Sequence, residues 1–89
     1  MMIKILKFES DSCPQCKALS ITLERITKEY KIDMKSIDIE EDNNQDLIKK
    51  YNIRSIPTLI FLNEDQEYNR LIGNQSYATI NKIINYDTI

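Results

Sequence analysis

Two cysteines, Cys13 and Cys16, are the residues whose type and spacing point most directly to chemistry. They are the only cysteines of the chain, and Pro14 and Gln15 lie between them in the order Cys-Pro-Gln-Cys. A disulfide between residues so close in sequence closes almost no loop, so it would add little stability as a structural crosslink. The spacing therefore favours thiol chemistry over a structural role.

Two other interpretations of the cysteine pair stay open on the residues alone. Structural zinc takes about four ligands, and the chain has no histidine and no further cysteine. A zinc site would therefore need thiolates from two copies of the protein, and we expect no metal. The pair could instead be two buried, redox-inert thiols in a binding module, which a disulfide-reduction assay would distinguish from an active dithiol.

The position of the pair supports disulfide exchange. Ile3 to Phe8 predicts a strand, and Pro14 suits the first position of a helix, where its missing N–H is no loss. Cys13 would then lie at the helix N-terminus, where free N–H groups and the helix macrodipole stabilise a thiolate, the attacking species in disulfide exchange. We expect Cys13 to attack a substrate disulfide and Cys16, one turn further along and less exposed, to resolve the mixed disulfide.

The sequence of 89 residues predicts a single α/β domain over residues 1–89. Apolar spacing and turn residues predict strands at 3–8, 34–39, 56–62 and 67–72, and helices at 14–30, at 46–51 and after Ser76. The apolar stripe of the first helix should consist of Leu19, Leu23, Ile26 and Tyr30. The first two strands are joined by a helix and should be parallel, whereas the last two are joined by a short turn and should be antiparallel. We therefore expect the order β-α-β-α-β-β-α, with a four-stranded mixed sheet and helices on both faces.

Composition excludes several function classes. A net charge of −2 and a pI of about 5.1 argue against nucleic-acid binding through a dense basic surface. The absence of histidine removes Cys-His and Ser-His dyads. The longest apolar stretch, residues 59–62, is far too short to span a membrane, and the lysines among the first residues do not fit a secretory signal. We expect a cytoplasmic monomer that binds neither nucleic acid nor a membrane.

Three segments together resemble the thioredoxin family. The run Cys-Pro-Gln-Cys-Lys at 13–17 follows a predicted strand, as the redox motif does in that family. Residues 51–58, Tyr-Asn-Ile-Arg-Ser-Ile-Pro-Thr, are similar to the family's segment around a cis-proline, and Gly73 is similar to its glycine before the last helix. The similarity runs from residue 3 to about residue 86 and implies a thioredoxin-like fold.

The resemblance also implies how a substrate binds. Pro57 should follow a cis peptide bond and lie against the cysteine pair, and the backbone of Ile56 should pair with an extended substrate segment. Pro14, Gln15 and Gly73 are the further candidates for substrate binding. The alternatives are a trans proline at a strand edge and, for Ile56, plain core packing.

Several departures point to a small, glutaredoxin-sized member of the family. The chain lacks the extra strand and helix with which full-length thioredoxins begin, and Pro14 occupies the first middle position of the motif, as in glutaredoxins. The single Gly73, followed by Asn74 and Gln75, does not match the double-glycine segment with which glutaredoxins bind glutathione. Gln15 agrees with the small glutaredoxin-like electron donors of ribonucleotide reductase, so this donor role is the alternative function.

The main functional prediction is a protein disulfide reductase active in electron transport and cell redox homeostasis. The resemblance implies recycling by a flavin-dependent thioredoxin reductase, so NADPH would be used indirectly and the dithiol would need no bound cofactor. Disulfide-containing proteins, ribonucleotide reductase among them, are the expected substrates.

Charged residues near the cysteines are candidates for tuning the acidity of the thiols. Lys7 and Lys17 would favour the thiolate, whereas Glu9 and Asp11 would oppose it. Lys7 lies six residues before Cys13, where the family has a buried acid. A buried ammonium without a partner is costly, so Lys7 should reach the surface or pair with an acid such as Glu9. The alternative for both lysines is an ordinary solvated surface charge.

Overall fold

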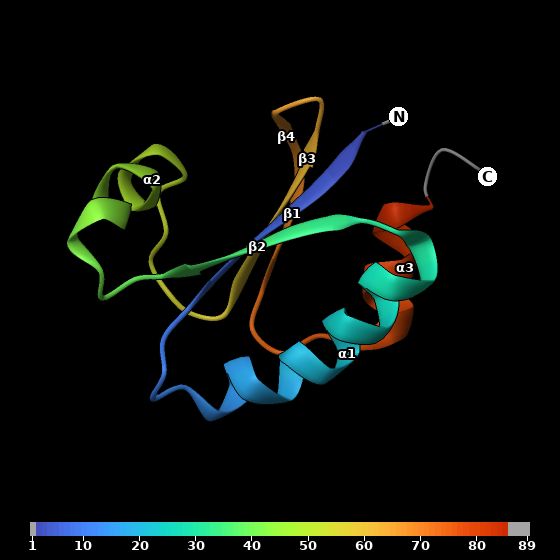
Figure 1. Ribbon diagram of the computed structural model, residues 1–89, viewed down its shortest axis with the longest axis horizontal. Coiled ribbons are helices and arrows are strands. Elements are labelled where there is room, and N and C mark those ends of the chain that lie inside the picture. Colours follow the sequence, from blue (N-terminus) through green and yellow to red (C-terminus); the bar gives the residue numbers. More distant parts are fainter. Residues whose placement is uncertain (1, 86–89) are drawn as a thin grey trace.

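The computed structural model describes residues 2–85 and arranges them as one sheet with helices on both faces (Figure 1). The elements follow the order expected from the sequence, with a short 3-10 helix, η1, added before the second α-helix. Their bounds are β1 (Ile3–Glu9), α1 (Pro14–Tyr30), β2 (Asp33–Asp38), η1 (Asp42–Asn44), α2 (Gln45–Lys50), β3 (Thr58–Asn63), β4 (Gln66–Ile72) and α3 (Tyr77–Ile84).

The sheet has the strand order β2-β1-β3-β4. β1 is parallel to β2 and antiparallel to β3, and β3 is antiparallel to β4. The parallel pair is connected through α1, whereas β3 and β4 form a hairpin, as their connection lengths require. The expected four-stranded mixed sheet is confirmed.

Alternate residues of the two central strands pack against different helices. Ile5 and Leu59 belong to a buried cluster that contains apolar residues of α1 and α3. Phe8, Ile60 and Tyr51 belong to a second cluster on the opposite face, which α2 covers. Figure 1 shows α1 and α3 lying together, with α2 well apart from them. The strand periodicity of two therefore separates the core into two layers.

The helix starts expected from the sequence are confirmed. Cys13 is the N-cap of α1 with extended backbone angles, and Pro14 is the first helical residue. Ser76 caps α3, because its hydroxyl accepts a hydrogen bond from the Thr79 N–H at 3.2 Å. The placement of Cys13 matters most, since it puts the first cysteine at the positive end of the helix dipole.

Two expectations about the elements are wrong. β3 begins at Thr58 instead of residue 56, because Pro57 has no N–H for the strand ladder and follows a cis peptide bond from Ile56. Tyr30, expected on the apolar stripe of α1, is exposed, and its hydroxyl donates to Asn81 Oδ1 on α3 at 2.6 Å. The other boundaries lie within one residue of expectation.

Residue 86, where the similarity was expected to end, lies outside the described residues. None of the helices within residues 2–85 combines the length and the apolar character that crossing a membrane would take.

Candidate active site

Cys13 and Cys16 form a disulfide at the start of α1. Their Cα atoms are 5.2 Å apart, and the Cys16 N–H donates a hydrogen bond to Cys13 Sγ at 3.1 Å. Cys13 is half-buried, whereas Cys16 is only 1% exposed. The more accessible sulfur therefore lies at the helix N-terminus, where free N–H groups stabilise a thiolate. Both the placement of the pair and the difference in exposure agree with the sequence-based expectation.

Pro14, Gln15 and Lys17 are exposed around the disulfide. The backbone N–H of Lys17 donates to the Cys13 carbonyl oxygen at 3.2 Å and so closes the first turn of α1. The side chain of Lys17 extends into solvent, where salt screens its effect on the thiols. Of the two lysines singled out from the sequence, Lys17 is therefore the weaker candidate for tuning the pair.

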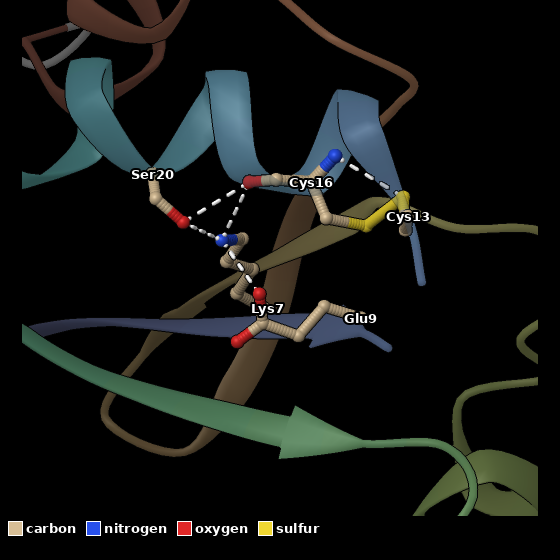
Figure 2. A network of polar contacts seen from close by, with 5 residues as sticks. All are labelled: Lys7, Glu9, Cys13, Cys16 and Ser20. Carbon is tan, nitrogen blue, oxygen red and sulfur yellow. Dashed lines mark hydrogen bonds and ion pairs between the residues drawn. A yellow bond between two sulfur atoms is a disulfide. The ribbon is translucent and has the colours of Figure 1, made fainter. Parts of the chain in front are cut away.

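Lys7 is the buried charge of the site. It lies on β1 beneath α1, is 1% exposed, and forms an ion pair with Glu9 Oε1 at 2.7 Å (Figure 2). Its Nζ also donates to the Cys16 carbonyl oxygen at 2.9 Å and to the hydroxyl of Ser20. These acceptors match the three N–H bonds of an ammonium group. The expected pairing with Glu9 is confirmed, and the interpretation of Lys7 as a solvated surface charge is wrong.

Ser20 belongs to this network, although the sequence analysis did not single it out. Its hydroxyl donates to the Cys16 carbonyl oxygen at 3.0 Å and also contacts Lys7 Nζ. The available signal was its spacing, since a residue four positions after Cys16 lies one helical turn further on the same face. The contact between Glu9 and Lys7 was predictable in a similar way, because residues two apart on a strand point to the same side of the sheet.

The cis-proline segment contains three of the further residues singled out from the sequence, which are Ile56, Pro57 and, through a hydrogen bond, Gly73. The Ile56–Pro57 peptide bond is cis, as the family resemblance implied. The Gly73 N–H donates to the Pro57 carbonyl oxygen at 2.8 Å, so the structure brings these two predicted residues together. Ile56 is half-buried and lines a hollow of about 300 Å³ together with Ile48 and Ile53. The side chain of Ile56 is therefore not wholly enclosed by the core.

Ile72 adds apolar surface beside the cis-proline segment, and the sequence analysis missed it. It is the last residue of β4 and pairs with Thr58, which directly follows Pro57. Its side chain is 59% exposed. A strand pattern alone did not reveal this exposure, because it depends on which helices cover the end of the hairpin.

The arrangement supplies what dithiol–disulfide exchange needs: an accessible sulfur at a helix N-terminus and a second sulfur within bonding distance. This chemistry requires no bound cofactor. Among residues 2–85, no group of three or more histidine, cysteine, aspartate or glutamate side chains is placed to bind a metal ion.

Known proteins share this fold and this chemistry. The thioredoxin family model matches residues 2–86. Thioredoxin from Porphyra purpurea is 28% identical over 81 residues, which cover 91% of this chain and 76% of that protein. Thioredoxin from Bacillus subtilis (strain 168) is 26% identical over 83 residues, covering 93% and 80%.

The structure of thioredoxin 1 from the thermophilic eubacterium Thermosipho africanus TCF52B superposes with a TM-score of 0.81 at 30% sequence identity. The superposition covers 96% of this chain and 94% of that one. Together with the disulfide between Cys13 and Cys16, the family match identifies the chain as a thiol-disulfide oxidoreductase of the thioredoxin family.

Proposed function

We propose that the chain reduces disulfide bonds in other proteins, with Cys13 as the nucleophile and Cys16 as the resolving thiol. The observation that carries this assignment is the difference between the two sulfurs. Cys13 is half-buried and caps α1, whereas Cys16 is 1% exposed and lies against Lys7. A substrate disulfide can therefore reach Cys13 before it can reach Cys16.

The reaction proceeds in two exchanges. The Cys13 thiolate attacks one sulfur of the substrate disulfide, the substrate S–S bond breaks, and the other substrate sulfur leaves as a thiolate. Cys16 then loses its proton and attacks Cys13 Sγ, which releases the second substrate thiolate. Two electrons have passed to the substrate, and the Cys13–Cys16 disulfide remains in the protein.

Substrates dock on the edge formed by Ile56 and Pro57 in this proposal. An extended segment on either side of the target cysteine pairs with the Ile56 backbone, next to Gly73. Pro14 and Gln15 contact the segment from the first turn of α1. The exposure of Ile72 beside this edge supports the assignment, since an apolar side chain left in solvent gains free energy when a partner covers it.

The family membership supports recycling by a flavin-dependent thioredoxin reductase, with NADPH as the electron source. The protein would then act in the cytoplasm as a single-domain monomer that carries electrons to disulfide-containing proteins. A glutaredoxin-type donor to ribonucleotide reductase, with glutathione as its reductant, is the alternative, and the experiment below tests which reductant recycles the protein.

A coupled assay tests the proposal with insulin as the protein disulfide. In one arm the protein is recycled by thioredoxin reductase and NADPH, and in the other by glutathione, glutathione reductase and NADPH. We expect NADPH oxidation in the first arm only, and none with a Cys13→Ser variant. Activity confined to the glutathione arm would support the glutaredoxin-type role, and inactivity in both arms would contradict the proposal.

A further inference from the structure

The ion pair between Lys7 and Glu9 has no part in the exchange steps described above, yet it contacts the redox site directly. Lys7 Nζ lies 2.9 Å from the Cys16 carbonyl oxygen and 2.7 Å from Glu9 Oε1. The Glu9 side chain is 24% exposed, so it reaches from the buried ammonium toward solvent. Figure 2 shows Lys7 and Glu9 side by side beneath the helix that carries both cysteines.

We propose that Glu9 is a positioning residue that sets the reduction potential of the Cys13–Cys16 pair by acting through Lys7. This inference rests on the proposed function, because a potential matters only for a dithiol that cycles. Glu9 neutralises the buried charge of Lys7 and keeps its side chain directed at the first turn of α1. The result is a dithiol that remains a strong reductant.

The electrostatic reasoning compares the two redox states. The disulfide carries no charge, whereas its reduction adds two electrons and produces at least one thiolate until a proton is taken up. A positive charge nearby stabilises the thiolate and thus the reduced form. The Glu9 carboxylate, in contact with Lys7 Nζ, opposes that effect. Without the Glu9 charge, the uncompensated ammonium would stabilise the reduced form and raise the reduction potential.

The hydrogen bonds explain why the influence of Glu9 passes through Lys7. With Glu9 as one acceptor, the ammonium has its two remaining N–H bonds for the Cys16 carbonyl oxygen and the Ser20 hydroxyl. Asp11 and Lys17 also lie near the disulfide in sequence, but both are exposed, and solvent screens their charges. Glu9 is therefore the carboxylate whose removal should matter most.

The test replaces Glu9 by glutamine, which keeps the shape of the side chain and removes its charge. The Cys13–Cys16 equilibrium is measured in glutathione buffers of defined ratio for the wild type and for Glu9→Gln. We expect a shift of about tenfold toward the dithiol, which corresponds to about 30 mV for a two-electron couple. The matched control is Asp11→Asn, which removes an exposed carboxylate two residues further along the chain and should shift the equilibrium by less than about twofold.

Lys7→Met provides a second, independent arm. It replaces the ammonium by an apolar side chain of similar length and leaves the Glu9 side chain, which is 24% exposed, without its partner. Removing one partner of a buried ion pair lowers stability, so the folding of this variant is checked by circular dichroism before the redox measurement. Because the ammonium that stabilises the thiolate is then gone, the equilibrium should shift several-fold toward the disulfide. In the Lys7→Met background, adding Glu9→Gln should have less effect than it has in the wild type.

Several results would overturn the proposal. The first two are that the dithiol–disulfide equilibrium of Glu9→Gln, or that of Lys7→Met, equals the wild-type equilibrium. The others are that Asp11→Asn shifts the equilibrium as much as Glu9→Gln does, or that Glu9→Gln has the same effect with and without Lys7. The measurement needs neither a protein substrate nor a reductase. Failure of the NADPH-coupled assay would therefore count against the proposed function alone, and an unchanged potential would count against the role of Glu9 alone.

Discussion

Replacing Ile72 by alanine tests whether protein substrates dock on the cis-proline edge. Full burial of an isoleucine side chain is worth about 1.5–3 kcal/mol. Because Ile72 is 59% exposed, about 1–2 kcal/mol of this remains to be gained when a substrate covers it. Alanine keeps a small part of that contact, so we expect a loss of about 1 kcal/mol in transition-state binding. This corresponds to a decrease of about fivefold in kcat/KM.

The assay compares insulin with a small aromatic disulfide, 5,5′-dithiobis(2-nitrobenzoate), as substrates. The decrease in kcat/KM should appear with insulin and be absent with the small disulfide, which is too short to cover Ile72. The matched control is Ile21→Ala on α1, where an isoleucine is 75% exposed but does not border the cis-proline segment. The docking proposal is refuted if Ile72→Ala reduces insulin as efficiently as the wild type does. It is also refuted if the kcat/KM of Ile72→Ala falls equally for both substrates, or if Ile21→Ala shows the same decrease with insulin.

Two further predictions concern the helix α3. Ser76→Ala removes the acceptor of the Thr79 N–H and should lower the free energy of unfolding by about 1 kcal/mol. Urea denaturation measures this, and an unchanged midpoint would mean that the cap contributes nothing. The hydrogen bond from the Tyr77 hydroxyl to Glu29 raises the pKa of Tyr77 from its usual 10.0 to about 12. Because this pKa is raised in the folded protein, the contribution of Tyr77 to stability is complete below pH 10 and is lost as the pH rises toward 12. In an ultraviolet titration, Tyr77→Phe should remove an ionisation step at about pH 12, whereas loss of a step near pH 10 would contradict the assignment.

Local patterns in the sequence predicted most of the elements, because apolar spacing reflects which face of an element is buried. The expected stripe on α1 included Leu19, Leu23 and Ile26, and all three are buried. Pro14 and Ser76 predicted the starts of α1 and α3 through their backbone and side-chain chemistry. The strand order had no such local signal, since it depends on which distant segments pair.

The site was predictable where its residues lie within one motif and less so where folding brings them together. Cys13 and Cys16 are three residues apart, so their place on a helix could be inferred from the sequence. Lys7 was conspicuous as a charge in an apolar strand, but its contacts with Ser20 and the Cys16 carbonyl oxygen depend on how α1 crosses β1. The exposure of Ile72 likewise depends on tertiary packing.

The most direct test of the proposed mechanism is to trap its intermediate. Cys16→Ser keeps the accessible Cys13 and removes the resolving thiol, so it should accumulate a mixed disulfide between Cys13 and a protein substrate. Mass spectrometry after acid quenching identifies the cysteine in the adduct, and Cys13→Ser provides the control. We predict a stable adduct through Cys13 in Cys16→Ser and none in Cys13→Ser. A stable adduct through Cys16 in Cys13→Ser, with none in Cys16→Ser, would contradict the assignment of the two roles.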